Sequence, residues 1–512
     1  MKVKIIVNRL ALFCFFQAFV VILTIMYVLV YVPDLVLVED SKQLNSEEEM
    51  VILERESEQK RQDILKERRA LSKGVSRQLS GGQTCVLFRF DALPGQEQTS
   101  SVAMINDGDE YAYLSKEGEY MPQNIPEWFH TKTDYCNGCF VTYGLSKCLI
   151  SLKEVTIYPK FGHGKPGGEE LEDVFMQTEE EEVFKLDKGY FVLNSNELDL
   201  SGVQFNTVLQ KFTNGLLIMK ETDINVLNAH KKQDRIAVIT ARREYANFYH
   251  TTMDWYDIFL IMVLFKIDLY HLEVIWLDAH PKSNFDPAWE ILFGVPIRVG
   301  SLSDPVKYEQ MIWNGFGHKS HINQHQIEYL PFVNEFRHFV LNRFQINDDH
   351  EVNCNELRIT IIWRRHYIAH PRNPSGYTSR RIANEEEVWR SVKEADFQAV
   401  VNGVQLDRLS MVEQLELVSR TDILIGMHGA GLSHILYLPE TSGVIELYPN
   451  YMSVANAHFR AMSKWRRLRH IVWMNQDNSL EKKDHQTYIP KTVIQDLVDT
   501  IKENICEKRI EL

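Results

Sequence analysis

From residue 236 onward, short apolar runs alternate with longer segments whose apolar residues recur at helical spacing. Residues 236–239 and 272–277 are apolar runs of the length of a buried strand, and 245–265 between them is apolar and long enough for a helix. A strand, a helix and a second strand in this order predict a parallel crossover unit.

The same alternation resumes near Leu357. It predicts strands at 357–363, 398–401, 422–425 and 443–447 and helices at 384–392 and 411–418. This order is typical of a doubly wound parallel sheet, which binds ligands at the carboxyl ends of its strands. We therefore expect an α/β protein with two Rossmann-type lobes facing a cleft, and a hinge within 333–356.

The strand expected at 422–425 runs into a glycine-rich turn that contains Gly429, Ala430 and Gly431, and an apolar helical segment follows. A strand, a glycine turn and a helix in succession direct free backbone N–H groups at a phosphate. The turn departs from the dinucleotide fingerprint because His434 stands where a third glycine or an alanine is expected. These residues alone fit phosphate binding and an ordinary tight turn equally well.

Charged residues lie at or near the carboxyl ends of two of the other expected strands. Arg364 and Arg365 lie at the carboxyl end of the strand at 357–363, and arginine matches phosphate oxygens in a bidentate way. A solvated basic loop is the alternative. Glu446 stands near the end of a later strand, where an acidic residue can reach a ribose hydroxyl or form a salt bridge with an arginine.

His250 and Asp254 are four residues apart in the expected helix at 245–265, so they share one of its faces. A histidine and an aspartate in a cleft can remove a proton from a hydroxyl nucleophile. The alternative is a core histidine whose partner is the aspartate.

The region from 84 to about 228 has a mixed pattern, with short strands expected at 85–90, 155–158 and 191–193. The acidic run Glu179–Glu182 is expected to be a solvated loop. Asp107-Gly108-Asp109 matches an Asp-x-Asp metal motif but lies in a turn-rich stretch, so we interpret it as a turn. Cys136-x-x-Cys139 has no second metal-binding half, which favours a structural disulfide over a zinc or redox site.

The N-terminus carries a basic flank and then an apolar run at 10–32, and about 20 apolar residues span a bilayer. Acidic residues follow the run, so the positive-inside rule predicts a type II anchor. We expect a cytoplasmic tail at 1–9, a transmembrane signal anchor at 10–32 and a lumenal stem at 33–83. The six cysteines beyond the span suit disulfides in an oxidising compartment, and the net charge of −14 argues against a nucleic-acid partner.

The turn His428-Gly-Ala-Gly-Leu432, followed by Gly443-Val-Ile-Glu-Leu-Tyr-Pro449, resembles glycosyltransferase family 61. Three further stretches are similar to the N-glycan core β-1,2-xylosyltransferases of that family: 243–256, 364–372 with Ser379-Arg380, and 463–465. The resemblance covers about 235–470, and the combination is far more specific than any one motif.

The resemblance implies a Golgi membrane enzyme with the two-lobed GT-B fold that transfers xylose from UDP-xylose, with inversion, to the β-mannose of the N-glycan core. It implies an acceptor-side lobe at 84–340, a nucleotide-sugar-binding lobe at 341–512, and no cofactor or essential metal. Its motif positions point to Asp254 as the first choice for the general base and His250 as the second.

The remaining site positions would bind the donor. The diphosphate is expected at His428, Gly429, Ala430, Gly431, Arg364 and Arg365, with Glu446 toward the uridine ribose and Lys464 as a further substrate contact. Two other interpretations stay open. One is a family 61 enzyme that transfers N-acetylglucosamine to O-linked or O-mannose acceptors, and the other is a non-catalytic lumenal glycan-binding protein.

Overall fold

The structure is a computed structural model that describes residues 110–114, 120–144, 146–219 and 231–506. The chain divides into two units, Met1–Gln62 and Asp63–Leu512, and every described residue belongs to the second. The expected tail, anchor and stem, the strand at 85–90 and the turn at Asp107-Gly108-Asp109 lie outside the described residues. Within the described ranges, no helix combines the length and apolar character needed to cross a membrane.

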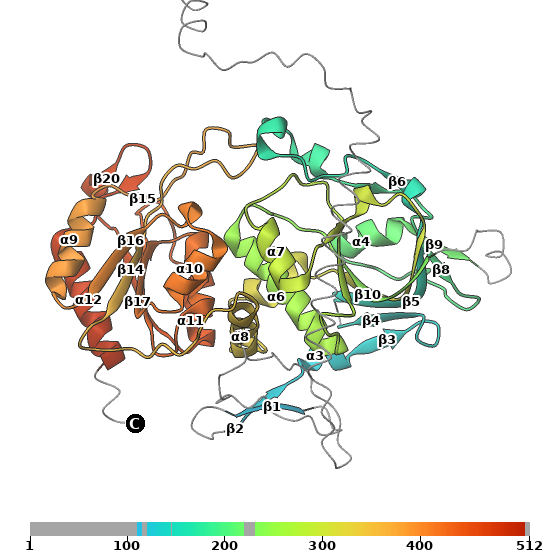
Figure 1. Cartoon of the computed structure of the whole chain (residues 1–512), viewed down its shortest axis with the longest axis horizontal. Coiled ribbons are helices and arrows are strands. Elements are labelled where there is room, and N and C mark those ends of the chain that lie inside the picture. Colours follow the sequence, from blue (N-terminus) through green and yellow to red (C-terminus); the bar gives the residue numbers. More distant parts are fainter. Residues whose placement is uncertain (1–109, 115–119, 145, 220–230, 507–512) are drawn as a thin grey trace, which may run out of the picture. The chain divides into compact units, whose positions relative to one another are not determined.

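The first lobe is built on a nine-stranded mixed sheet with the order β12-β11-β10-β13-β5-β4-β3, where β8 also pairs with β5 and β9 with β8 (Figure 1). Its strands are β3 Lys132–Asp134, β4 Phe140–Tyr143, β5 Leu149–Ile157, β8 Phe191–Asn194, β9 Leu216–Met219, β10 Lys231–Thr240, β11 Leu272–Trp276, β12 Ile297–Arg298 and β13 Val306–Asn314. Strand β10 runs parallel to β11 and β13. The predicted crossover unit is therefore confirmed.

Helix α6 (Phe248–Phe265) connects β10 to β11, and the Asn247 side chain caps its start by accepting from the Tyr249 backbone N–H. Its sequence is apolar on nearly every face, which is typical of a helix buried between layers, and most of its side chains are buried. The other helices of this lobe are α3 Glu127–His130, α4 Thr207–Asn214, α7 Asp286–Phe293 and α8 Val333–Arg343.

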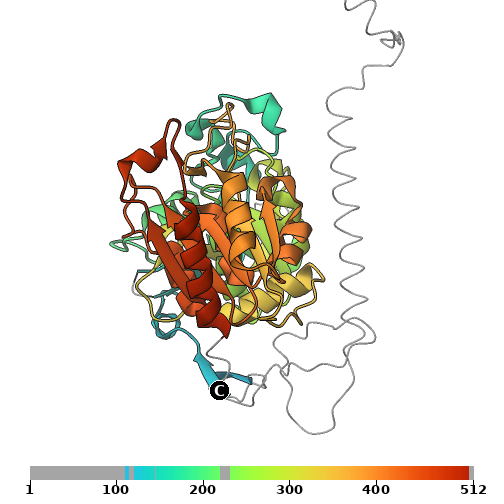
Figure 2. The same cartoon turned by 90° about the vertical axis from the view of Figure 1, so that its left-hand side faces the viewer.

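The second lobe contains a five-stranded, all-parallel sheet with the order β16-β14-β17-β18-β19. Its strands are β14 Arg358–Ile362, β16 Val400–Val404, β17 Ile423–Met427, β18 Gly443–Tyr448 and β19 Arg469–Met474, and its helices are α9 Glu385–Ala395, α10 Met411–Val418, α11 His458–Trp465 and α12 Lys491–Cys506. Helices α9 and α12 cover one face and α10 and α11 the other (Figure 1), and Figure 2 shows α12 lying across the sheet. The predicted doubly wound sheet is confirmed.

Short strands and 3₁₀ helices lie between these elements. The small strands are β1 Glu110–Leu114, β2 Tyr120–Asn124, β6 Gly162–His163, β7 Lys185–Leu186, β15 Arg381–Ile382, β20 Glu481–Lys482 and β21 Gln486–Thr487. The 3₁₀ helices are η1 Pro159–Phe161, η2 Leu171–Val174, η3 Glu179–Glu182, η4 Val299–Ser301, η5 Gly317–Lys319, η6 His321–Asn323, η7 Leu406–Arg408, η8 Ala430–Tyr437 and η9 Asn478–Leu480. The helical segment expected after the glycine turn is thus the 3₁₀ helix η8.

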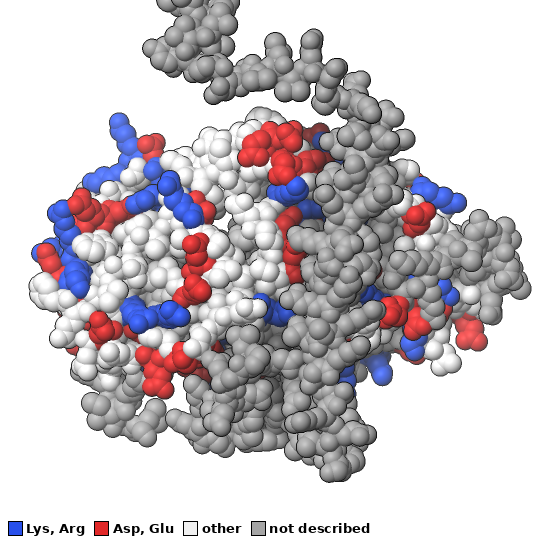
Figure 3. Space-filling model, viewed as in Figure 1, with Lys and Arg blue, Asp and Glu red and all other residues white. Residues whose placement is uncertain are grey.

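The acidic run at Glu179–Glu182 differs from the expected solvated loop. It forms η3, and its last residue, Glu182, is only 1% exposed. The Glu182 carboxylate accepts from His280 Nδ1 at 2.8 Å and pairs with Arg372 at 2.9 Å. The other acids of this segment stay at the surface, where Figure 3 shows Asp and Glu gathered around η2 and η3. The prediction was wrong for Glu182 because its two basic partners lie far away in the sequence.

Two disulfides link described cysteines. Cys136 bonds to Cys139, which confirms the structural interpretation of the Cys-x-x-Cys pair. Cys354 bonds to Cys506 and so ties the segment before β14 to the end of α12. Cys148 is a free, buried thiol.

Candidate functional site

The chain order of the second sheet marks where a ligand would bind. Numbered within this lobe alone, the strand order is 2-1-3-4-5, so the direction of winding reverses between β14 and β17. Open α/β sheets bind ligands at this switch point, outside the carboxyl ends of the two strands. Arg364 follows the end of β14 and Gly429 follows the end of β17, so both lie at this place.

Arg364 packs directly on the glycine turn. A Cβ atom built on Gly429 would lie 2.2 Å from Arg364 Nη1, so the guanidinium occupies the space that any other side chain would need. Arg364 Nε donates to the Ser379 carbonyl oxygen at 3.2 Å. Burial and the neighbouring charge of Arg380 lower the pKa of Arg364 to about 10.

Arg380 is the second cation at this turn. Its Nη1 donates to the His428 carbonyl oxygen at 2.8 Å, and burial lowers its pKa. Its φ of 57° lies in the left-handed region, where a residue with a side chain is strained, and such strain concentrates at functional sites. Across the described ranges, no carboxylate forms a salt bridge with Arg364 or Arg380, so this pair presents uncompensated positive charge to an anion.

Arg365 has a different environment from Arg364. Its side chain is half exposed and pairs with Glu385, to which Arg365 Nε donates at 2.9 Å. Adjacent residues of an extended segment point in opposite directions, which accounts for the difference. A phosphate contact by Arg365 therefore stays a prediction, and the geometry favours Arg364 and Arg380.

Glu446 lies in β18 behind the glycine turn, and its side chain is 1% exposed. One carboxylate oxygen is 2.6 Å from His428 Nδ1 and the other is 2.9 Å from His470 Nε2. Burial alone would raise the pKa of Glu446, but these two hydrogen bonds lower it to about 2, so it is ionised at neutral pH. The carboxylate therefore accepts from both rings.

This arrangement fixes how His428 is oriented. In the neutral form of His428 with its proton at Nδ1, facing Glu446, Nε2 carries a lone pair, the relation in which a carboxylate orients a catalytic imidazole. The predicted contact of Glu446 with a ribose stays a prediction that this geometry does not favour, since both oxygens are engaged by histidines rather than by an arginine or a ligand.

His250 and Asp254 lie on α6 as predicted, but no hydrogen bond joins them within the described residues. Burial, Arg243 and His318 lower the pKa of His250 to about 4, so the ring is neutral at pH 7. Burial raises the pKa of Asp254 to about 8, partly opposed by the nearby charge of Arg242. An ionised Asp254 would therefore be a stronger base than an ordinary carboxylate, as general-base catalysis requires.

Side chains from both lobes meet close to these candidates. The Tyr249 hydroxyl is 2.8 Å from His458 Nδ1, and the His428 ring lies 6.4 Å from that of His458. Lys464 is on the same helix as His458 but is exposed. The sequence patterns did not identify His458 as a site residue. Its position as the first residue of α11 is the one signal that could have suggested it.

Arg380 was visible in the sequence only as part of a basic loop. Its sole signal was its place in the Ser379-Arg380 pair of the family stretch, because its contact with His428 depends on the fold. No group of three or more potential metal ligands occurs among the described residues.

The comparison with protein families covers the part of this site that carries α6, the two arginines and the glycine turn, while Glu446, His458 and His470 lie beyond the matched residues. Residues 245–445 match the family model described as Glycosyltransferase 61. This segment is a glycosyltransferase family 61 domain. It includes α6, β14, the glycine turn and the first half of β18.

Named relatives fall into two groups. The β-1,2-xylosyltransferase RCN11 of Oryza sativa subsp. japonica is 25% identical over 344 residues, 59% of this chain and 63% of the relative. The β-1,2-xylosyltransferase of Arabidopsis thaliana is 22% identical over 438 residues, 72% of this chain and 80% of the relative. The EGF domain-specific O-linked N-acetylglucosamine transferase of Drosophila melanogaster is 34% identical over 146 residues, 28% of this chain and 24% of the relative. The matched part thus spans less than two thirds of the rice relative.

Proposed function

We propose that this protein is an inverting glycosyltransferase that transfers xylose from UDP-xylose, in β-1,2 linkage, to the core β-mannose of N-glycans. The observation that carries the proposal is the pair Arg364 and Arg380 at the switch point of a parallel sheet, packed on a glycine turn and lacking carboxylate partners among the described residues. Two relatives named β-1,2-xylosyltransferase support xylose as the sugar.

The geometry suggests how the leaving group is stabilised. Arg364 and Arg380 would contact the diphosphate, and the backbone N–H groups that begin η8 have no acceptor within the helix, so they can donate to the same anion. Cations and N–H groups fixed in place before the reaction stabilise the charge that develops on UDP as the sugar leaves.

Transfer also requires a base for the acceptor hydroxyl. Asp254 is the first candidate and His250 the second, as the sequence predicts, while His428 backed by Glu446 is a third that the structure adds. In this proposal the enzyme has the GT-B fold, with an acceptor-side lobe at 84–340 and a nucleotide-sugar lobe at 341–512. It is anchored in the Golgi membrane as a type II protein and needs no metal or cofactor.

The similarity to an EGF domain-specific O-linked N-acetylglucosamine transferase favours a second candidate. In that case the same site would bind UDP-N-acetylglucosamine and act on an O-linked acceptor. The two donors share the UDP group, so the cationic pair serves either one, and the sugar pocket decides between them.

The test is an assay of the full-length protein with a panel of UDP-sugars, a defined N-glycan and a folded EGF domain. Xylose transfer to the N-glycan with inversion is expected. Transfer of N-acetylglucosamine to the EGF domain alone would replace the first function with the second. Binding of glycan with no transfer from any UDP-sugar would indicate a non-catalytic lectin.

A further inference from the structure

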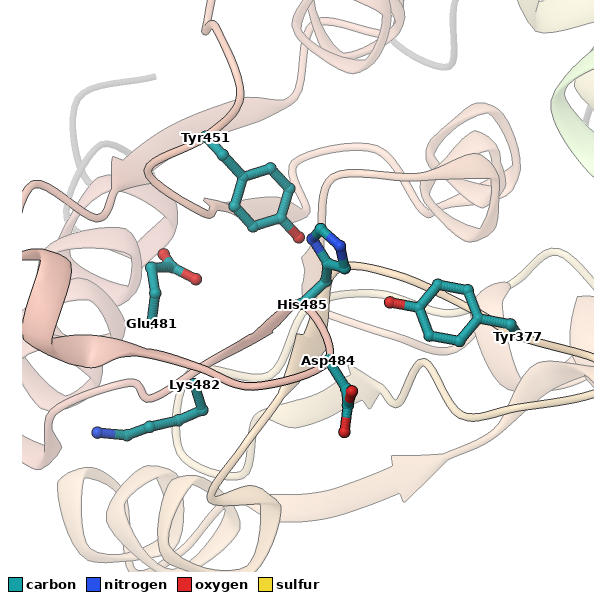
Figure 4. Close-up of a pocket in the computed structure, with 6 residues that line it drawn as sticks. All are labelled: Tyr377, Tyr451, Glu481, Lys482, Asp484 and His485. Carbon is teal, nitrogen blue, oxygen red and sulfur yellow. The ribbon is translucent and has the colours of Figure 1, made fainter.

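A pocket of about 350 Å³ lies beside the cationic pair in the second lobe. Its lining is Tyr377, Tyr451, Glu481, Lys482, Asp484 and His485 (Figure 4). The two tyrosines are large side chains left exposed at the surface, at 43% and 46%. In Figure 4 their hydroxyl ends point toward His485, and the ring of Tyr451 lies 5.2 Å from the His485 ring. Three aromatic rings therefore gather around one open space.

The pocket is contiguous with the proposed diphosphate site. The hydroxyl of Tyr451 lies next to the backbone N–H of Arg380, and Tyr451 is close enough to interact electrostatically with both Arg364 and Arg380. On the other side, Tyr377 belongs to the loop that connects Arg364 to Arg380. A molecule bound to the two guanidiniums through its phosphates would thus have its next chemical group in reach of Tyr451.

The segment that supplies His485 is held in a costly conformation. Asp484 and His485 have φ values of 61° and 55°, in the hairpin between β20 and β21. Both sit in the left-handed region although neither is glycine, and each such residue costs about 1 kcal/mol or more. The Glu481 carboxylate fixes the base of this hairpin by accepting from the Asn450 N–H at 2.9 Å and from Thr487 Oγ1 at 2.9 Å. These contacts hold His485 in place at the wall of the pocket.

We propose that this pocket is the subsite for the nucleobase of the donor, with the pyrimidine ring stacked on Tyr451 and enclosed by Tyr377 and His485. The inference rests on the proposed function, since it takes the diphosphate to lie at Arg364 and Arg380. A planar base offers a π-face that stacks on aromatic side chains, whereas the phosphates need cations, and the protein places these two environments side by side.

The test compares UDP with inorganic pyrophosphate as ligands of the full-length protein. In Tyr451→Ala the dissociation constant of UDP should rise about 5- to 150-fold, the effect of losing one base–aromatic stack, while that of pyrophosphate stays unchanged. Tyr451→Phe keeps the ring and should bind UDP almost as wild type does. Phe397→Ala is the matched control, because Phe397 is 76% exposed and precedes β16, at the opposite end of the sheet.

Each other outcome overturns a specific statement. Unchanged UDP affinity in both Tyr451→Ala and Tyr377→Ala refutes the base subsite but leaves the proposed function intact. A raised acceptor KM with unchanged UDP affinity assigns the pocket to the glycan and likewise refutes it. If wild-type protein binds neither UDP nor pyrophosphate, the proposed function fails and the subsite fails with it. Loss of pyrophosphate binding in Tyr451→Ala would show damage to the anion site and refute a role confined to the base.

Discussion

Substituting Gly429 by alanine should weaken donor binding through Arg364, although no atom of Gly429 is charged. The new Cβ would lie 2.2 Å from Arg364 Nη1 and 2.8 Å from Cζ. Ordinary contact needs roughly 3.5 Å, so the guanidinium has to move by about 1.3 Å. The backbone at Gly429 is extended, with φ 165°, so alanine brings no conformational strain of its own.

The magnitude follows from what the guanidinium does at the site. A hydrogen bond to a charged group contributes about 1.5–3 kcal/mol, and it is lost when the donor is displaced by more than 1 Å. The dissociation constant of UDP should therefore rise about 10- to 150-fold. The variant should keep the overall fold, because the group that has to move is the guanidinium at the end of the flexible Arg364 side chain.

The neighbouring glycine provides a matched control. The atoms nearest to a Cβ on Gly431 would belong to the side chains of Ile362 and Leu406, both at 3.4 Å, which is ordinary contact. Isothermal titration calorimetry with UDP should show near-wild-type affinity for Gly431→Ala and weak binding for Gly429→Ala. In an Arg364→Ala background, Gly429→Ala should add little, because the group it displaces is already absent. Equal UDP affinity in Gly429→Ala and wild type would refute the placement of the diphosphate at Arg364.

Three more predictions test the base, its positioning and the disulfides. Asp254→Asn should bind UDP normally but not transfer sugar, and normal turnover by this variant would exclude Asp254 as the base. The kcat/KM of the wild-type enzyme should rise with pH up to about 8, because burial raises the pKa of Asp254 and only the ionised carboxylate accepts a proton. Glu446→Gln should lower kcat at least about tenfold with UDP affinity kept, since His428 loses a charged acceptor; an unchanged kcat would make Glu446 structural only. Cys354→Ser should lower the free energy of unfolding by about 2–5 kcal/mol and Cys136→Ser by much less. The Cys354–Cys506 disulfide links residues 152 apart in the sequence, whereas Cys136–Cys139 links residues 3 apart. Equal melting temperatures of the two variants would contradict this difference.

The parts of the fold that the sequence predicts well are those with strong local patterns. Helix α10 was predicted with the same bounds, and in the structure Ser410 and Glu413 form a capping box at its start, a signal that is local in the sequence. Strands β14, β17 and β18 were predicted because each is a short apolar run, and Arg364 and the glycine turn follow the carboxyl ends of β14 and β17 as expected.

The details of the site escaped prediction because they depend on register and on distant partners. Arg364 and Arg365 are equivalent in composition, and only the fold decides which one turns toward the glycine turn. Glu446 pairs across the sheet with Gly426 and Val472, so histidines near the ends of the neighbouring strands reach its carboxylate. Neither the orientation of the two arginines nor the histidine contacts of Glu446 can be predicted from the spacing of apolar residues.

The loop between Arg364 and Arg380 links the proposed donor site to the first lobe. Its middle pairs Arg372 with Glu182 at 2.9 Å, and the Pro371 carbonyl oxygen accepts from the Met176 N–H at 3.1 Å. Both ends of the loop carry the guanidiniums that face the glycine turn, so the loop is fixed at its ends in one lobe and at its centre on the other. Glu182 is buried and pairs with both Arg372 and His280, so a shift of the first lobe would displace the centre of this loop. The position of Arg364 and Arg380 therefore depends on both lobes, although the two arginines and the glycine turn all belong to the second.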